Sequence, residues 1–248
     1  MIITVHSYKG GTGKTLLSVN LATMFANRGK KTCLLDLDFR APSLHVIFKT
    51  AKSEYWLNDY LNRACELDMV LRDCSSNCAE KEKLFVGLAN PSTEAMREMA
   101  SKNRKWEMDA LCRLLALKES VVNESSFDYM IFDSSPGLEY CSINAVVCAD
   151  VVLVVTTLDE SDLEGTKRMI QELYKICEKK TAVVLNKVPY RFLPIDNLER
   201  KLESLHLPIV GAIPCLCDIP ETGEYFFVSK KPYHVFTKTI QKVATRIE

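Results

Sequence analysis

A glycine-rich segment near the amino terminus, SYKGGTGKT at residues 7–15, constrains the fold more than any other feature. It follows a short apolar run, MIITVH at residues 1–6, and leads into an amphipathic pattern over residues 14–28. The segment matches G-x-x-x-x-G-K-[ST] except that Ser7 stands where the pattern has its first glycine. Between a strand and a helix this pattern forms a phosphate-binding loop. The sequence therefore predicts an α/β fold that begins with such a site.

Short apolar runs and helical patterns alternate along the rest of the chain. Further strands are expected at 32–37, 83–89, 128–133, 150–157, 180–186 and 208–213, most of them continuous runs of Val, Ile and Leu. Such runs are typical of strands covered on both faces. Helices are expected at 161–177, with Asp159 and Ser161 as candidate caps, and at 232–247. We predict a doubly wound, mostly parallel sheet flanked by helices, in one domain spanning 1–248.

The bulk composition excludes few functions. The formal net charge is zero, so the chain as a whole has no electrostatic attraction to nucleic acid or anionic membrane. We expect no secretory leader, because residues 1–6 lead directly into the glycine loop, and no apolar run approaches the roughly 20 residues that span a bilayer. The ten cysteines are therefore expected to be reduced thiols in a cytoplasmic protein. Residues 50–82 are less regular, with a helix expected at 55–61 and an exposed loop at 73–83.

The residues of the glycine loop have distinct expected tasks. Its glycines allow the backbone to approach phosphate oxygens closely, and the amides at the helix start favour an anion. Lys14 is expected to contact the β- and γ-phosphates, and the Thr15 hydroxyl to ligate Mg²⁺. The alternative is a glycine turn without a ligand. The nucleotide contacts expected in this segment come from Lys9, Gly10, Gly11, Thr12, Gly13, Lys14, Thr15 and Leu16.

Two apolar runs end in carboxylates. LLDLD ends in Asp36 and Asp38, and FDYMIFD at 127–133 ends in Asp133, which precedes the turn Ser134–Gly137. Ligands of open α/β sheets bind beyond the carboxyl ends of the strands, so these side chains are expected near the phosphates. Asp133 is the candidate Walker B ligand of Mg²⁺, and Asp38 is expected to orient water or support the metal. For Asp36 the alternative is a turn cap.

A fourth segment, VVLNKVP, places Asn186 at a strand end where it would contact a base. Guanine-specific sites typically carry Asp two residues after the Lys of the Asn-Lys pair, but here that position holds Pro189. Adenine is therefore the expected base. Pro214 and Cys215 after the last strand are candidates to pack on it. The alternative for Asn186 is a cap of the next loop.

KGGTGKT, LLDLD, the SSPG turn that follows Asp133, and LNK in this order resemble the ParA/MinD group of deviant Walker A ATPases, over nearly the whole chain. NPSTEAMREM and KWEMDALCRLL resemble an archaeal MinD-like branch of that group. The resemblance implies Mg-ATP binding, an ATP-dependent homodimer undone by slow hydrolysis, an activating partner protein, and a role in intracellular positioning such as chromosome or plasmid partition or division-site placement.

The resemblance also assigns roles to Lys9 and Asp38. Lys9 corresponds to the signature lysine that reaches the nucleotide of the second subunit. Because Lys14 already serves its own phosphates, a second cation would neutralise transition-state charge only in the dimer. Asp38 corresponds to the catalytic or water-positioning aspartate. The alternative for Lys9 is a solvated loop lysine.

The working surface of the chain is a separate question. MinD proteins carry an amphipathic membrane-targeting helix after the core, whereas here the core pattern runs to Glu248, so membrane targeting by that route is not expected. A basic set on and before the last helix is a candidate for non-specific DNA phosphate, with a solvated helix face as the alternative. Its members are Lys230, Lys231, Lys238, Lys242 and Arg246.

The cysteines leave two other functions open. Cys215 and Cys217 form half of a tetrahedral site that a dimer would complete, as in a metal-centre maturation ATPase, although core packing is the simpler interpretation. Cys141 with Cys112 would place an iron–sulfur cluster between subunits, as in nitrogenase iron protein, which resembles the same group. The exposed pair Cys74 and Cys78 is a weaker metal candidate. A phosphotransferase is open on the phosphate loop alone.

Overall fold

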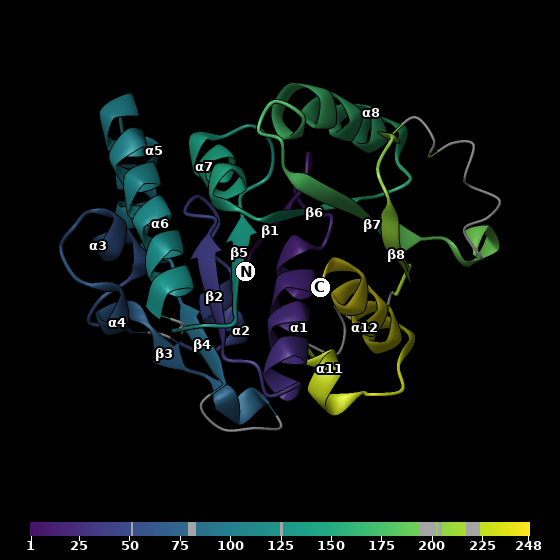
Figure 1. Cartoon of the computed structure of the whole chain (residues 1–248), viewed down its shortest axis with the longest axis horizontal. Coiled ribbons are helices and arrows are strands. Elements are labelled where there is room, and N and C mark those ends of the chain that lie inside the picture. Colours follow the sequence, from purple (N-terminus) through teal and green to yellow (C-terminus); the bar gives the residue numbers. More distant parts are fainter. Residues whose placement is uncertain (51, 79–82, 125, 194–201, 203–204, 217–223) are drawn as a thin grey trace.

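An eight-stranded sheet organises the computed structural model, which describes residues 1–50, 52–78, 83–124, 126–193, 202, 205–216 and 224–248. The spatial order of the strands is β3-β4-β2-β5-β1-β6-β7-β8, and all neighbours run parallel except β3 and β4 (Figure 1). The strands are β1 Ile2–His6, β2 Thr32–Leu37, β3 Arg72–Asp73, β4 Leu84–Gly87, β5 Tyr129–Ser134, β6 Val151–Thr156, β7 Lys180–Val188 and β8 Ile209–Pro214. The predicted fold class is confirmed.

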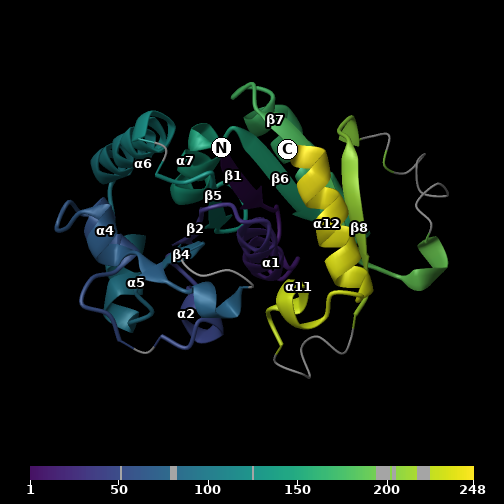
Figure 2. The same cartoon turned by 60° about the horizontal axis from the view of Figure 1, so that its bottom comes forward.

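Helices cover both faces of the sheet. On one face α1, α11 and α12 lie against one another, and α6, α7 and α8 cover the other (Figures 1 and 2). The helices are α1 Lys14–Asn27, α2 Leu44–Ile47, α3 Leu57–Leu61, α4 Leu67–Val70, α5 Thr93–Ala100, α6 Arg104–Glu124, α7 Tyr140–Cys148, α8 Glu160–Met169, α11 Phe227–Lys230 and α12 Val235–Ile247. None of the described helices is long and apolar enough to cross a membrane.

Each central strand sends alternate side chains to opposite layers. In β1, Ile3 and Val5 pack in the core shared with α1 and α12, while Ile2 belongs to the core on the α7 side. In β2, Leu34 and Leu35 divide in the same way. Because both faces are buried, an apolar residue is needed at every position, which explains the continuous apolar runs in the sequence.

Several elements differ from the expectation. The two-residue strand β3, which was not expected, pairs antiparallel with β4 and ends at Asp73, the first residue of the segment expected to be an exposed loop. The helix expected at 161–177 is α-helical only to Met169 and continues as a π-helix over Ile170–Tyr174. Helices α6 and α7 were not predicted as elements, because their apolar residues are interspersed with charged or small polar ones.

The register of the central strands sets the position of the functional side chains. Val5 of β1 and Asp36 of β2 both pair with Asp133 of β5. The carboxyl ends of these three strands therefore lie at one edge of the sheet, where the glycine loop leaves β1 and turns into α1. This edge is the usual ligand site of an open α/β sheet.

Candidate nucleotide-binding site

The glycine loop requires glycine at its tightest points. Gly11 and Gly13 have φ angles of 74° and 97°, in the left-handed region that other residues rarely adopt. A Cβ at Gly13 would stand 2.2 Å from Nδ2 of Asn186, so no other side chain fits there without displacing its neighbour. The loop backbone is thus held against β7 and left open on its ligand side, as a phosphate cradle requires.

Lys14 is held inside the loop by the residue that departs from the motif. Its side chain is buried, and Nζ donates to Oγ of Ser7 at 3.0 Å. Ser7 Oγ in turn donates to the carbonyl of Lys9 at 2.6 Å. Burial lowers the pKa of Lys14, and the carboxylates of Asp133 and Asp38 oppose that shift. A desolvated ammonium with neighbouring carboxylates and no direct ion pair is suited to an incoming phosphate.

Asp133, near the end of β5, is buried and has one carboxylate oxygen without a hydrogen-bond partner. Its Oδ1 accepts from Ser18 Oγ at 2.9 Å, whereas its buried Oδ2 has no partner. Burial raises the pKa of Asp133 to about 6, against the effects of the Ser18 hydrogen bond, the nearby Thr15 hydroxyl and the charge of Lys14. A buried orphan carboxylate oxygen next to a threonine hydroxyl fits Mg²⁺ or a water of its shell, since hard cations prefer oxygen ligands.

Asp36 and Asp38 have different environments. Asp36 is fully buried, its Oδ1 accepts from the backbone N–H of Asp38 at 3.2 Å, and burial together with the charge of Asp133 raises its pKa. It therefore caps the turn after β2, the alternative considered for it. Asp38 lies in the wall of the open cleft with Lys14 and Thr15. Of the two, only Asp38 is placed to reach a water near the phosphates.

The nucleotide cleft has a volume of about 500 Å³. Its wall joins the cradle to the segments after β2 and β5, and Lys187 bounds its other side. The residues that line it are Gly10, Gly11, Gly13, Lys14, Thr15, Leu16, Asp38, Arg40, Ala41, Ser135, Pro136, Glu139 and Lys187. Most of the sequence-predicted phosphate and metal residues thus converge on one cavity, whereas Lys9 and Thr12 line a neighbouring one and Asp133 is buried beneath the surface.

Asn186 connects the cradle to β7. Its Nδ2 donates to the carbonyl of Thr12 at 2.7 Å, and its Oδ1 accepts from the backbone N–H of Lys187 at 2.8 Å. The amide thus fixes the loop, and its predicted contact with adenine stays a proposal. Pro214 pairs with Val188 at the ends of β8 and β7. Cys215 follows, exposed, and donates its N–H to the Val188 carbonyl, two residues beyond Asn186.

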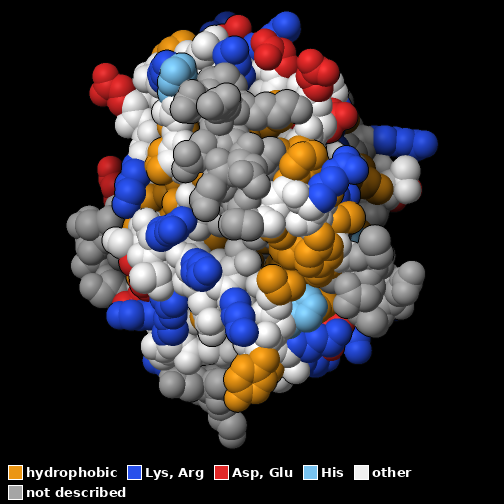
Figure 3. All heavy atoms as spheres, turned by 90° about the vertical axis from the view of Figure 1, so that its right-hand side faces the viewer, with side chains coloured by type: hydrophobic (Ala, Val, Ile, Leu, Met, Phe, Trp, Pro, Cys, Tyr) orange, Lys and Arg blue, Asp and Glu red, His pale blue; other side chains and the backbone are white. Residues whose placement is uncertain are grey.

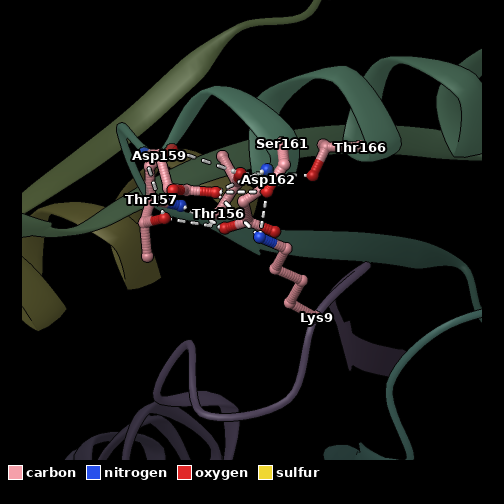
Figure 4. Close-up of polar contacts among 7 residues, drawn as sticks. All are labelled: Lys9, Thr156, Thr157, Asp159, Ser161, Asp162 and Thr166. Carbon is pink, nitrogen blue, oxygen red and sulfur yellow. Dashed lines mark hydrogen bonds and ion pairs between the residues drawn. The ribbon is translucent and has the colours of Figure 1, made fainter.

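Lys9 is directed away from the cradle of its own chain. Its Nζ forms an ion pair with Asp159 Oδ1 at 2.8 Å and also donates to Ser161 Oγ (Figure 4). The pair lowers the pKa of Asp159 and raises the pKa of Lys9. Asp159 also caps α8 by accepting from the N–H of Asp162, which confirms the predicted cap. Lys9 therefore rests on α8, at the rim of a second cavity of about 620 Å³.

Tyr8 packs on the helix that holds Lys9. A Cβ at Gly165 of α8 would stand 2.1 Å from the ring of Tyr8, so the ring lies directly on the helix backbone. The start of the glycine loop thus touches α8 through two consecutive residues, Tyr8 and Lys9. No pattern in the sequence signals this contact, because Gly165 lies within a helical segment.

Two residues of the site were not predicted from the sequence. Arg40, exposed in the cleft wall, forms an ion pair with Glu139 at 2.9 Å and so links the segments after β2 and β5. Ser7 stands out in the sequence only as a departure from the motif, although its hydroxyl binds Lys14. For Arg40, its position two residues after Asp38 was the only available signal.

The cysteine candidates do not converge on the cleft. Cys141 is half-buried and its pKa is raised to about 11 by burial, while Cys112 is exposed on α6. Cys217 lies outside the described residues. Burial also raises the pKa of Cys74 to about 11 and of Cys78 to about 12. Within the described part of the chain, no three His, Cys, Asp or Glu side chains are grouped to hold a metal ion.

Comparison with known proteins identifies the family. The AAA domain family model matches residues 1–186. The septum site-determining protein MinD of Thermotoga maritima is 31% identical over 229 residues, which cover 88% of this chain and 76% of that protein. The chain belongs to the MinD/ParA family of P-loop ATPases. As a member of this family it is an ATPase.

Solved structures of MinD proteins share the whole fold of this family member. The cell division ATPase MinD of Pyrococcus furiosus has a TM-score of 0.78 at 22% identity, covering 99% of this chain and 97% of that one. MinD of Pyrococcus horikoshii, complexed with Mg-ADP, has a TM-score of 0.77 at 20% identity, covering 100% and 95%. These likenesses extend through β8 and α12, beyond the range of the family model.

Proposed function

We propose that this chain is a Mg-ATP-dependent dimerisation switch that serves intracellular positioning in the cytoplasm. The observation that carries the proposal is the pair of lysines in one loop, with Lys14 buried inside the cradle and Lys9 directed out of it. Mg-ATP fits the cleft because Lys14, Thr15 and the free oxygen of Asp133 supply phosphate and metal contacts. With the nucleotide bound, the metal would neutralise phosphate charge while the glycine loop orients the phosphate groups.

Lys9 is the proposed link between two subunits. Its side chain is 41% exposed and contacts the carboxylate of Asp159, so a competing anion can capture it. The phosphates of a nucleotide bound to a second copy are such an anion, and they carry more charge than one carboxylate. Lys9 would then stabilise charge that develops during hydrolysis only when two chains face each other. Asp38, in the same cleft as Lys14, is the proposed water-positioning residue.

The division-site role is supported by the Thermotoga maritima relative, which is a septum site-determining protein. Partition of a chromosome or plasmid is the second role that an ATP-dependent dimer of this family suggests. An activating protein would accelerate hydrolysis and so release the dimer from its surface.

Non-specific DNA is the surface we propose for the dimer. Basic side chains gather on the face of the molecule that includes β8 and α12 (Figure 3). Two members of the predicted set are already engaged: Arg246 donates to the carbonyls of Ile209 and Val210, and Lys230 pairs with Glu224. Lys238 and Lys242 are exposed on α12 and would supply the phosphate contacts.

Size-exclusion chromatography with ATP, with ADP and without nucleotide tests the switch. We expect elution near twice the chain mass of 28.1 kDa with Mg-ATP alone. Lys14→Ala is the control, since it removes the cis phosphate contact and should elute as a monomer throughout. A native chain that elutes identically in all three conditions contradicts the proposal.

The same samples identify the surface when a DNA duplex or anionic vesicles are added. We expect the ATP form to bind DNA, with a weaker response in Lys238→Gln/Lys242→Gln and a loss at higher salt. Lys102→Gln is the matched control, because it changes a lysine that follows α5 and lies outside the basic set of α12. Binding to vesicles but not to DNA contradicts the choice of surface while leaving the switch intact.

A further inference from the structure

His6 occupies a junction that the ATPase site described above does not use. It is the last residue of β1, directly before the glycine loop, and its side chain is completely buried. Its ring contacts two segments remote in sequence: the π-helix that continues α8, through Tyr174, and the turn after β5, through Gly137. π-helical turns are frequently found at functional sites.

The chemistry of the partners fixes the direction of both hydrogen bonds. The Gly137 carbonyl can only accept, so Nε2 of His6 carries the hydrogen of the 2.8 Å contact. Nδ1 must then accept, from the hydroxyl of Tyr174 at 2.7 Å. Burial lowers the pKa of His6 to about 4 and raises the pKa of Tyr174, which keeps the ring neutral and the hydroxyl protonated. The Gly137 carbonyl thereby selects the tautomer, and the Tyr174 hydroxyl holds the ring in place by donating to its other nitrogen.

Gly137 anchors the cleft segment formed by residues 135–139. Its N–H donates to the Ser7 carbonyl at 2.8 Å, so both polar groups of its backbone are bonded to consecutive residues, Ser7 and His6. Its φ of 75° requires glycine. Just before it, Pro136 stands 3.9 Å from where Gly10 would carry a Cβ. The position of Gly137 therefore sets how closely this segment approaches the cradle.

The hydrogen bond from His6 to Gly137 holds a segment that borders the cleft in which we expect hydrolysis. Ser135 and Pro136 line the same cleft as Lys14 and Asp38. The Gly137 carbonyl also accepts from Ser142 Oγ at 2.9 Å, at the start of α7. Without His6 this carbonyl would be held by α7 alone, and the bond from the Gly137 N–H to Ser7 would be left as the backbone hydrogen bond between Gly137 and the start of the glycine loop. A displacement of about 1 Å of a group that positions substrate costs up to about a hundredfold in rate.

We propose that His6 is a positioning residue for ATP hydrolysis: oriented by Tyr174, it holds the Gly137 carbonyl and thereby keeps residues 135–139 against the phosphate cradle. This inference rests on the ATPase activity of the family and does not depend on which surface the proposed dimer uses. It also assigns a role to the π-helix, which brings the Tyr174 hydroxyl to the ring of His6.

The Tyr174→Phe variant tests the orienting bond, since it removes one hydroxyl and keeps the aromatic packing. Tyr60→Phe is the matched control: Tyr60 is also buried, and its hydroxyl bonds a backbone carbonyl, that of Arg113, away from the cleft. We expect kcat of Tyr174→Phe to fall about tenfold, with the nucleotide Kd within about twofold of native because the cradle is unchanged. Equal kcat losses in both variants, or no loss in Tyr174→Phe, overturn the proposal.

Two substitutions of His6 separate positioning from packing. The His6→Gln amide can donate to Gly137 and accept from Tyr174, whereas His6→Met fills the space without either bond. We expect His6→Gln to retain most of the native kcat and His6→Met to lose it, with similar melting temperatures. If both variants hydrolyse ATP at the native rate, His6 has no positioning role.

The tautomer is measurable without any turnover. Long-range ¹H–¹⁵N correlation spectra at neutral pH should show His6 protonated on Nε2 alone in the native chain, and a shifted Nδ1 signal in Tyr174→Phe, because that nitrogen loses its hydrogen-bond donor. The chain has four histidines, so the His6→Gln spectrum assigns the signal. Protonation on Nδ1 in the native chain overturns the proposal even if the ATPase results are as expected.

Discussion

Lys9 and Asp159 form an ion pair between the glycine loop and the N-terminus of α8, with 2.8 Å between Nζ and Oδ1. The pair joins residues 150 positions apart in the sequence. In the proposed dimer Lys9 has to leave Asp159 before it reaches the second nucleotide. The ion pair therefore opposes dimerisation in the isolated chain, and its removal should be visible in the dimer equilibrium.

Asp159→Ser removes the carboxylate and retains an oxygen that caps α8, because serine is as good an N-cap as aspartate. We expect the ATP concentration needed for half-maximal dimerisation to fall by a few-fold at most, since exposed ion pairs are weak. Analytical ultracentrifugation across an ATP series measures this shift.

Two controls accompany that measurement. Asp109→Ser, which breaks the exposed pair with Arg63, should leave the dimer equilibrium unchanged. Lys9→Ala should abolish both dimerisation and the dimer-dependent ATPase rate. A Lys9→Ala chain that dimerises and hydrolyses ATP as the native chain does would rule out the trans role of Lys9.

Asp38→Ala should separate binding from hydrolysis. Asp38 lies in the cleft wall, whereas Lys14 supplies the buried phosphate contact, so ATP affinity should stay within a few-fold of native while kcat falls by about a hundredfold or more. The dimer should then persist for hours in Mg-ATP. Asp36→Asn, at the buried turn cap, should instead change the melting temperature. Rapid return of Asp38→Ala to monomer would contradict its role.

Gly13→Ala should damage the loop far more than Gly10→Ala. At position 13 the new Cβ meets Asn186 at 2.2 Å and the backbone has a φ of 97°, whereas at position 10 the nearest atom, in Pro136, is 3.9 Å away. Backbone strain of this kind costs about 1–3 kcal/mol. We expect a lower free energy of unfolding and weaker nucleotide binding for Gly13→Ala alone, as measured by denaturant titration and fluorescent ADP. Equal effects at both positions would contradict this account.

The stability conferred by Mg-ATP should depend on pH through Asp133. Its pKa in the folded chain, about 6, lies above the ordinary 3.8, so the folded apo form retains a proton that the unfolded chain has lost. The free energy of unfolding of the apo chain therefore falls as pH rises from about 4 to 6. Mg²⁺ requires the carboxylate form, so the increase in melting temperature on adding Mg-ATP should grow from about pH 5 to 7.

Asp133→Asn is the reference for that experiment, because the nucleotide's own titration is common to both chains. The variant should show a smaller and flatter response to Mg²⁺ across the same range. His6 does not interfere, since its pKa of about 4 leaves it neutral there. Identical pH profiles for the two chains would show that Asp133 does not hold the metal.

Local patterns were sufficient to predict much of this molecule from its sequence. The strands could be found because burial on both faces demands unbroken apolar runs. Lys14, Thr15 and Asp133 could be found because polar residues that follow parallel strands meet at one edge of the sheet. Contacts between distant segments were not predictable in this way. The bonds from Lys9 to Asp159, from Arg40 to Glu139 and from His6 to Tyr174 depend on how loops fold over the sheet edge.

The short strand β3 was missed for another physical reason. Two residues, Arg72 and Asp73, carry no alternating pattern, and only the edge of β4 makes them a strand. The π-helix at Ile170–Tyr174 has the same composition as an α-helix. That residues 1–248 form a single domain, and that Asn186, Pro214 and Cys215 contact adenine, stay predictions.

The packing of Tyr8 on Gly165 constrains how this chain can diverge. With a Cβ at position 165 only 2.1 Å from the ring, position 165 cannot gain a side chain while the ring of Tyr8 stays in place. In an alignment of orthologues, a side chain larger than hydrogen at position 165 should appear only where position 8 has lost its ring. The two positions, 157 residues apart, should therefore vary as a correlated pair. Their covariation would show that the glycine loop packs on α8 in those orthologues as well.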